Sequence, residues 1–170
     1  RKPSMVIDFQ SHLFPEEYLN EMARIQGTVI LEAPDPYSGM SYFYDSTLTC
    51  RINTATFQGR DPDRRVEHMD RLGIDVQILS VPPPGADRFD GAGASSLARK
   101  ANDALARICK KYPRRFVGLF TLPTASIKAS LEEIERSVNE LGLSGFGCYS
   151  NLNGRPLDHE AFFPLYARLA

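Results

Sequence analysis

Helical and strand patterns alternate along most of this chain, and this alternation restricts its fold more than any other feature. Apolar residues recur at helical spacing in 61–73, 95–113 and 126–142, and a short apolar strand follows each segment. One more strand, "VIDF", stands near the N-terminus. Strands that alternate with helices form βαβ units with parallel strands. The sequence therefore predicts an α/β fold, either a doubly wound sheet or a (β/α)8 TIM-type barrel.

The helix expected over 61–73 has clear boundary signals. Asp61 stands at the N-cap position, Pro62 at the first helical position and Gly73 just past the end. These signals predict both ends of the helix.

Two regions depart from the alternation. Residues 27–59 are rich in Thr, Ser, Tyr and Phe and contain Pro34, Pro36 and Gly39, a texture typical of short strands joined by turns. The last segment begins a helix at Pro164 without a stop signal, and four visible strands are too few for a barrel of ~250 residues. We expect residues 1–170 to be the N-terminal half of one barrel domain with a β-rich insertion at 27–59. A small four-stranded domain, complete in itself, is the alternative.

The composition limits the classes of partner. The chain has 20 basic and 21 acidic residues and a net charge of -1, which argues against a nucleic-acid-binding surface. No apolar run approaches the ~20 residues that span a bilayer, and Asp8 interrupts the N-terminal apolar run. Cys50, Cys109 and Cys148 are widely spaced and odd in number, as expected of reduced thiols. We expect a cytoplasmic protein that binds neither nucleic acid nor a membrane.

Polar side chains stand where the predicted strands end. In the first strand, Asp8, Gln10 and His12 occupy alternating positions, so their side chains should converge on one side. Polar residues also end the later strands: Ser80, Thr121, Tyr149 and Asn151. The C-terminal ends of the strands are where a barrel carries its active site. The sequence contains no G-x-G-x-x-G, P-loop or G-x-S-x-G motif, so a dinucleotide site, a P-loop and a nucleophile elbow are not expected.

Four segments resemble a known family when taken together. "IDFQSHLFPEEYL", "HMDRLGIDVQILSVPP", "AND…YPRRFVGLFTLP" and "NLNGRPLD…FFPLY" occur in the same order and spacing as in the amidohydrolase-related decarboxylases. The nearest type is aminocarboxymuconate-semialdehyde decarboxylase, and γ-resorcylate decarboxylase is a relative. The resemblance extends from Val6 to Tyr166. It implies a barrel that holds one divalent metal ion, commonly zinc, at its C-terminal mouth, an insertion folded over that mouth, and a homodimer.

The resemblance also implies metal ligands. An H-x-H pair after the first strand falls on Gln10 and His12, and the further ligands would lie beyond Ala170. His12 fits this role. Gln10 departs from it, because an amide oxygen is a weaker donor to zinc than imidazole or carboxylate. The site is therefore either maintained with an oxygen ligand or weakened and lost. Asp8 is expected to orient a ligand or to have a structural role.

Substrate-binding residues follow from the same resemblance. Arg51 in the insertion resembles the arginine that clamps the substrate carboxylate, a task that suits its planar fork. An exposed arginine on a hairpin is the alternative. Asn151 and Tyr149 end the fourth strand and are expected to face the pocket. His68 and His159 are expected at the surface or at helix caps.

These features favour one function over two others. We expect a metal-dependent non-oxidative decarboxylase, a carboxy-lyase that acts on a small unsaturated or aromatic carboxylic acid. The first alternative is a metal-dependent hydrolase of a C–C, lactone or amide bond. The second is a catalytically impaired or truncated homologue, because Gln10 stands in place of a histidine ligand.

Overall fold

A computed structural model describes residues 4–25, 30–31, 41–44, 49–52 and 61–170. Its helices are α1 (Glu16–Arg24), α3 (Pro62–Leu72), α4 (Gly91–Lys111), α5 (Ile127–Glu135) and α6 (Phe163–Leu169). Three short helical turns are η1 (Ala86–Arg88), the π-helical η2 (Arg136–Glu140) and η3 (Glu160–Phe162). The strands are β1 (Ile7–His12), β2 (Ile30–Leu31), β3 (Ser41–Tyr44), β4 (Thr49–Ile52), β5 (Val76–Ser80), β6 (Phe116–Phe120), β7 (Gly145–Phe146), β8 (Asn151–Leu152) and β9 (Arg155–Pro156).

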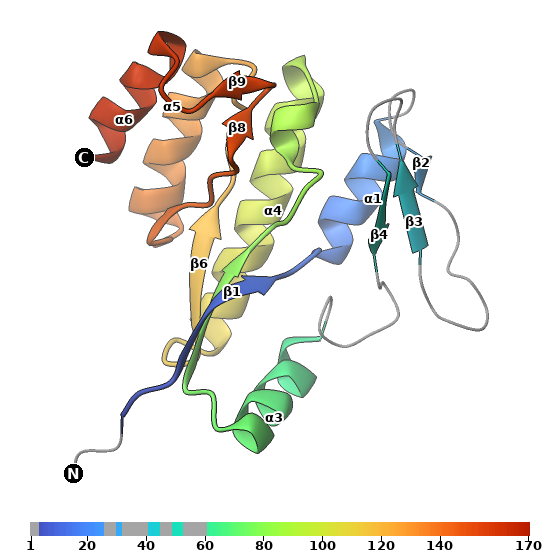
Figure 1. Ribbon diagram of the computed structural model, residues 1–170, viewed down its shortest axis with the longest axis vertical. Coiled ribbons are helices and arrows are strands. Elements are labelled where there is room, and N and C mark those ends of the chain that lie inside the picture. The colour runs from blue at the N-terminus through green and yellow to red at the C-terminus, as the bar shows by residue number, and fades with distance from the viewer. Residues whose placement is uncertain (1–3, 26–29, 32–40, 45–48, 53–60) are drawn as a thin grey trace.

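The main sheet has four parallel strands in the order β1-β5-β6-β7, with helices between them along the chain (Figure 1). Each new strand is added on the same side of the preceding one. A doubly wound sheet reverses this direction, whereas a barrel never does. The order therefore confirms the α/β prediction and selects the first four β/α units of a barrel over a doubly wound sheet.

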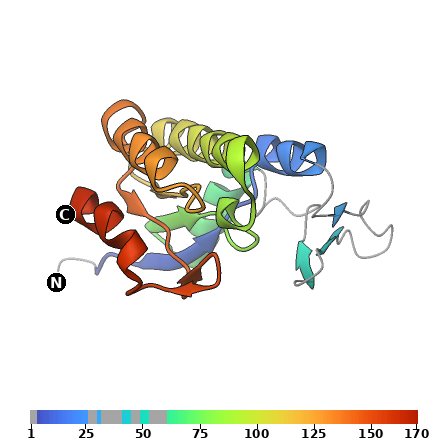
Figure 2. The ribbon, with the colours of Figure 1, turned by 90° about the horizontal axis from the view of Figure 1, so that it is seen from above.

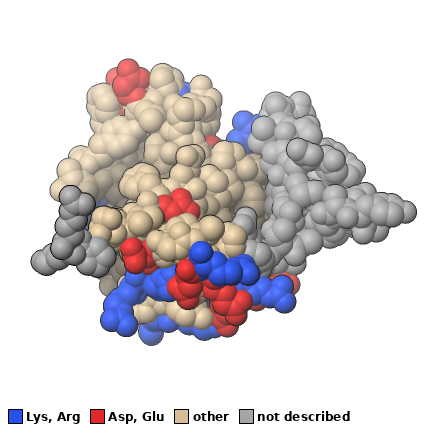
Figure 3. All heavy atoms as spheres, turned by 60° about the horizontal axis from the view of Figure 1, so that its bottom comes forward, with Lys and Arg blue, Asp and Glu red and all other residues tan. Residues whose placement is uncertain are grey.

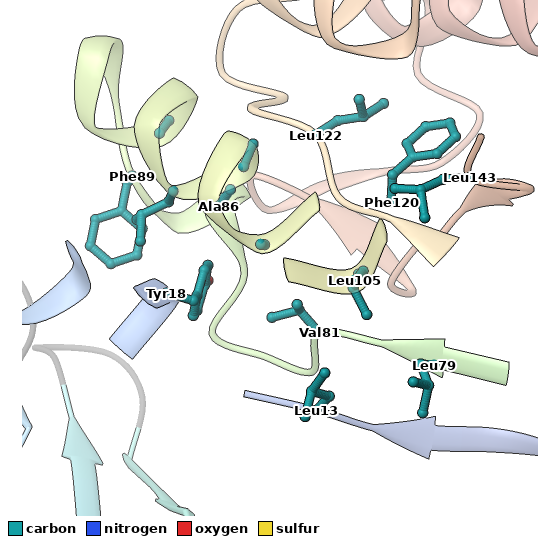
Figure 4. Close-up of a cluster of buried hydrophobic side chains, with 14 of the residues drawn as sticks. Leu13, Tyr18, Leu79, Val81, Ala86, Phe89, Leu105, Phe120, Leu122 and Leu143 are labelled. Atoms are coloured by element: carbon teal, nitrogen blue, oxygen red, sulfur yellow. The ribbon is translucent and has the colours of Figure 1, made fainter. Parts of the chain in front are cut away.

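Helices cover one face of this sheet. Figure 2 shows α1, α4 and α5 side by side in a layer above the strands. The core lies between the layers and includes Leu79, Leu105, Phe120 and Leu122, each at most 1% exposed (Figure 4). The opposite face is less covered. Its residues on β5 and β6 are only half-buried: Val76, Ile78, Val117 and Leu119.

The predicted boundaries of α3 are confirmed. The Asp61 carboxylate accepts hydrogen bonds from the main-chain N–H groups of Asp63 (2.9 Å) and Arg64 (3.4 Å). Gly73 ends the helix at a φ of 68°, a left-handed conformation that glycine adopts without strain. Other boundaries differ from expectation: α4 begins at Gly91 instead of Ser95, and β7 is limited to two residues.

The predicted β-rich insertion contains an antiparallel sheet of order β2-β3-β4 (Figure 1). Short strands are thus confirmed for the described part of 27–59. The described part of the chain contains no helix with the length and apolar character needed to cross a bilayer.

A buried polar cluster fixes the C-terminal end of β6. The Asn102 amide on α4 accepts from the Thr121 N–H (2.8 Å) and donates to the Thr121 carbonyl (3.0 Å) and to Glu133 Oε1 on α5 (2.7 Å). Asn102 is fully buried, and Glu133 is 3% exposed. One amide therefore ties two helices to the strand end next to the candidate site.

The charged surface mixes both signs. Figure 3 shows Lys and Arg side chains interleaved with Asp and Glu along the lower part of the molecule. Ion pairs also join α3 to later residues of the chain, for example Asp70 with Arg115 at 2.7 Å.

Candidate metal and substrate site

Strand β1 has one residue more than the neighbouring strand β5 in the stretch between Asp8 and Ser11, which includes Gln10. Asp8 pairs with Gln77, and the next aligned pair is Ser11 with Leu79. Two residues of β1 therefore lie opposite one residue of β5, which is the arrangement of a β-bulge. Because of the extra residue, Asp8 and Ser11 point to the same face of the sheet, whereas in a regular strand residues three apart point to opposite faces.

Asp8, Gln10 and His12 all line one cavity of about 370 Å³ next to α3, so the structure brings the three residues together, although not on one face of a regular strand. The Asp8 carboxylate lies on the helix-covered side, where Oδ2 accepts from Ser11 Oγ (2.6 Å) and from Gln77 Nε2 (2.9 Å). The hydrogen bond from Ser11 is the main reason why the pKa of Asp8 is lowered. Strict alternation would have required an unbroken pleat, and the bulge breaks it.

His12 ends β1 directly opposite Ser80, and its ring is exposed. The ring nitrogen Nδ1 lies 3.2 Å from Ser80 Oγ. In the tautomer in which Nδ1–H donates to this hydroxyl, Nε2 carries the lone pair and can bind a metal ion; in the other tautomer the hydroxyl donates to Nδ1. One of the two tautomers of His12 therefore suits a metal ligand.

A cavity of about 550 Å³ lies at the C-terminal ends of the strands. Gln10 and His12 both line it, so these two predicted ligands are brought together. Its other lining residues are Phe9, Ser80, Val81, Pro83, Leu119, Gly147, Cys148, Tyr149 and Ser150. Apolar walls with a few convergent polar groups suit a small organic ligand.

Tyr149 forms a wall of this cavity with its hydroxyl already engaged. The hydroxyl donates to the Val81 carbonyl at 2.8 Å, and burial raises the pKa of Tyr149 above its usual value. The ring packs over Gly85, where an added Cβ would lie 2.4 Å from the Tyr149 hydroxyl oxygen. Burial also raises the pKa of Asp87, two residues after Gly85. Tyr149 thus links the loop after β5 to the segment after β7.

The other predicted substrate residues, Asn151 and Arg51, belong to two smaller sheets. Asn151 is exposed in β8, and its side-chain oxygen accepts from the Gly154 N–H (3.2 Å), which stabilises the turn of the β8–β9 hairpin. Arg51 lies in β4 opposite Tyr42, but its side chain falls outside the described part of the chain. Substrate contacts of Arg51, Asn151 and Tyr149 remain predictions. His159 caps η3 by accepting from the Ala161 N–H (3.2 Å), as expected of a capping residue.

Arg65 on α3 was not anticipated from the sequence. Its guanidinium donates through Nη2 to the His12 carbonyl (2.7 Å) and through Nη1 to Gln77 Oε1 (3.2 Å). The signal was present, because Arg65 precedes the buried Met69 by four residues and therefore shares its helix face. The positive charge alone suggested an exposed position.

Two donors on one cavity wall fit part of the coordination shell of a divalent ion. Such ions take about four to eight ligands, depending on the metal. Within the described ranges, no group of three or more His, Cys, Asp or Glu residues could hold a metal. Gln10 and His12 therefore fit as a partial ligand set that water, substrate or other residues must complete.

Comparisons with known proteins agree with this geometry. A family model for amidohydrolases matches residues 7–170. The chain is 31% identical over 166 residues to 2-amino-3-carboxymuconate-6-semialdehyde decarboxylase of Dictyostelium discoideum, covering 96% of this chain and 45% of that protein. It is 39% identical over 109 residues to gamma-resorcylate decarboxylase of a Polaromonas species, covering 64% of this chain and 32% of the relative.

A solved structure matches the fold over almost the whole chain. The 5-carboxyvanillate decarboxylase of Novosphingobium aromaticivorans, in complex with manganese and 4-hydroxy-3-methoxy-5-nitrobenzoic acid, aligns with a TM-score of 0.74 and 28% identity. The alignment covers 98% of this chain and 47% of that structure, so the chain spans about half the length of this relative. Taken together with the family match and the order of the strands, these likenesses show that the chain belongs to the amidohydrolase family.

Proposed function

We propose that this protein acts as a metal-dependent non-oxidative decarboxylase of a small unsaturated or aromatic carboxylic acid. The observation that carries the proposal is the placement of Gln10 and His12 on one cavity wall at the C-terminal end of β1. The relatives named above are decarboxylases of such acids, which supports the choice of reaction.

The residues that line the cavity would have different roles, which follow from their chemistry. His12 Nε2 and the Gln10 amide oxygen would hold a divalent ion, and Ser80 would keep the His12 ring in place. A bound ion would supply a Lewis acid and lower the pKa of a bound water. Phe9 and Leu119 give apolar surface for the unsaturated part of the substrate. Arg51 is the proposed partner of the substrate carboxylate.

The identity of the metal is part of the proposal. Family resemblance suggests zinc, whereas the related 5-carboxyvanillate decarboxylase contains manganese. An amide oxygen suits Mn²⁺ better than Zn²⁺, since carbonyl and carboxylate oxygens are the donors that Mn²⁺ prefers. Gln10 therefore favours manganese for this protein.

We also propose that the chain forms the N-terminal half of a single barrel, with 27–59 covering the mouth, in a cytoplasmic homodimer. Support comes from the strand order and from the partly exposed inner face of the sheet, where Ile7 is 51% and Phe9 is 74% exposed. In such a barrel, the second half would complete the ligand set.

The test is release of CO₂ by the purified protein loaded with Mn²⁺ or Zn²⁺. The substrates are 2,6-dihydroxybenzoate and 5-carboxyvanillate, with His12→Ala as the control variant. We expect CO₂ above the uncatalysed level, lost on chelation and in His12→Ala. Bond hydrolysis of added lactones or amides without CO₂ release would favour a hydrolase. Failure to bind either ion would contradict the proposal and favour an impaired homologue.

A further inference from the structure

Arg65 is a buried cation without a directly paired anion in the described part of the chain. It is 6% exposed, and its guanidinium donates hydrogen bonds to the neutral oxygens of His12 and Gln77. Burial lowers the pKa of Arg65 to about 10, so it is still charged at pH 7. A buried charge that lacks an ion-pair partner is costly to maintain. Asp8 is the anion whose charge favours the protonated form of Arg65, and it is joined to Arg65 through Gln77. The contacts of Arg65 therefore call for a specific role.

These contacts form a continuous chain of hydrogen bonds around the bulge in β1. From Arg65, the chain runs through Gln77 Nε2 to Asp8 Oδ2 (2.9 Å), which also accepts from Ser11 Oγ (2.6 Å). Arg65 separately holds the His12 carbonyl (2.7 Å). The network therefore fixes the strand on both sides of the extra residue, before it at Asp8 and after it at Ser11 and His12.

The bulge decides which way His12 faces. Side chains two and four residues apart share a face of a regular strand, so a regular β1 would put His12 on the side of Asp8, under the helices. With the bulge, Asp8 and Ser11 share the covered side, and His12 lies opposite Ser80 at the cavity. Holding the bulge is equivalent to holding His12 in the site.

We propose that Arg65 is a positioning residue for His12, which acts through the His12 carbonyl and the Gln77–Asp8 network to keep the imidazole on the cavity side. The inference rests on the proposed function only where it concerns metal binding. The orientation of the ring can be measured without any metal.

The first test is the ¹⁵N NMR spectrum of histidine-labelled, metal-free protein. Only three histidines are present, so each ring can be assigned by substitution. We expect Arg65→Lys to move the His12 ring signals and to leave those of His159 in place. Arg115→Lys is the matched control, because Arg115 also donates to main-chain carbonyls, Ile74 (3.0 Å) and Asp75 (3.0 Å), at the opposite end of the sheet. Unchanged His12 signals in a folded Arg65→Lys protein would overturn the inference.

The second test is the dissociation constant for Mn²⁺ alone. Groups that orient a metal ligand typically contribute about 10- to 100-fold to metal affinity, and we expect Arg65→Lys to lose affinity in this range. Arg115→Lys should change the dissociation constant for Mn²⁺ by less than about threefold, because Arg115 does not contact the site. If the unsubstituted protein binds no Mn²⁺, the proposed function fails, and the NMR result still decides the positioning role. If Arg65→Lys does not fold, Gln77→Met separates Arg65 from Asp8 and must shift the His12 signals in the same way.

Discussion

In the proposed metal site, Gln10 is the residue expected to set the choice of metal. An imidazole suits Zn²⁺, whereas an amide oxygen suits Mn²⁺. We expect Gln10→His to raise the affinity for Zn²⁺ roughly tenfold or more and to change the affinity for Mn²⁺ much less. Competition with a metal-sensitive dye measures both constants. Gln10→Asn keeps an amide and is the control. Equal gains for the two ions would contradict the view that the donor type at position 10 sets the preference.

Gly85 lies so close to the Tyr149 ring that the site has no room for a Cβ atom. An added Cβ would lie 2.4 Å from the Tyr149 hydroxyl oxygen and 2.6 Å from Asp87 Oδ1, so the ring would have to move. We expect Gly85→Ala to lower the free energy of unfolding by about 1–3 kcal/mol, as overpacking usually does. Gly147→Ala is the control, since its nearest contact, Ser80 Cβ, would be at an ordinary 3.4 Å. Urea unfolding curves compare the two, and equal losses would speak against the close contact at Gly85.

At the level of single residues, the sequence was informative for His12 and did not reveal the bulge that follows Asp8. The position of His12 at a strand end can be read from an apolar run followed by polar residues. The bulge cannot be read from the sequence, because the hydrogen bond that accompanies it joins Asp8 to Gln77, 69 residues later. No local pattern carries that contact.

Elements were predictable where local signals mark both ends. For α3, Asp61 and Gly73 gave the boundaries that the structure confirms. The β8–β9 hairpin was missed, although Asn153 and Gly154 form the dipeptide typical of such turns and have φ values of 53° and 73°. Strand β7 is shorter than expected and is limited to Gly145–Phe146.

Helices α1 and α4 are joined by a buried carboxylate whose effect depends on pH. Glu21 is 5% exposed and accepts from Arg24 Nη2 (2.6 Å) and Ser96 Oγ (2.6 Å). The hydrogen bonds from Arg24 are the main reason why its pKa is lowered from 4.5 to about 2. A lowered folded-state pKa stabilises the protein above the unfolded value and is lost as the pH falls through the folded value.

We therefore expect the free energy of unfolding to fall between about pH 4.5 and 2, with Glu21 contributing on the order of 1–3 kcal/mol. Glu21→Gln should remove this part of the pH dependence and lower stability at pH 7. Chemical unfolding at a series of pH values measures the curve. A Glu21→Gln curve parallel to that of the unsubstituted protein would rule out this role.

The Asn102 cluster makes a second prediction at this scale. Asn102→Ala leaves the buried Glu133 carboxylate without this amide and removes both bonds to Thr121. We expect a loss of about 2–4 kcal/mol in the free energy of unfolding. Asn139→Ala, which removes one exposed bond to Glu135 (2.9 Å), should cost no more than about 0.5 kcal/mol. Similar losses for both variants, measured in urea, would contradict the importance assigned to the buried cluster.

For the whole molecule, the parallel pairing of the strands was predictable and the covering of the inner face was not. Regular alternation of helices and strands implies parallel strands but fits both a doubly wound sheet and a barrel, and the observed order β1-β5-β6-β7 distinguishes the two. Composition and periodicity do not reveal how strongly each face is buried. Phe9, an aromatic residue in an apolar strand, reads as a core residue but is 74% exposed.

Metal binding should be visible in the stability of the entire fold. An ion that binds only the folded state adds about 2.7 kcal/mol at a free concentration of 100 times its dissociation constant. We expect Mn²⁺ to raise the thermal midpoint, a chelator to reverse the rise, and His12→Ala to abolish it. Differential scanning calorimetry measures the shift. A shift of the same size in His12→Ala would place the ion elsewhere.

The bulge in β1 also makes the strand tolerant of a one-residue deletion at this point. The ladder to β5 is aligned at Asp8 and again at Ser11, and the surplus residue lies between them. Exchange of Phe9 for another side chain keeps the count and hence the facing of both flanks. Loss of one residue between Asp8 and Ser11 leaves a single residue opposite Ile78, so the pleat becomes even and both flanks keep their facing. A gap of one position here in a related sequence therefore leaves the strand-end histidine on the same side of the sheet.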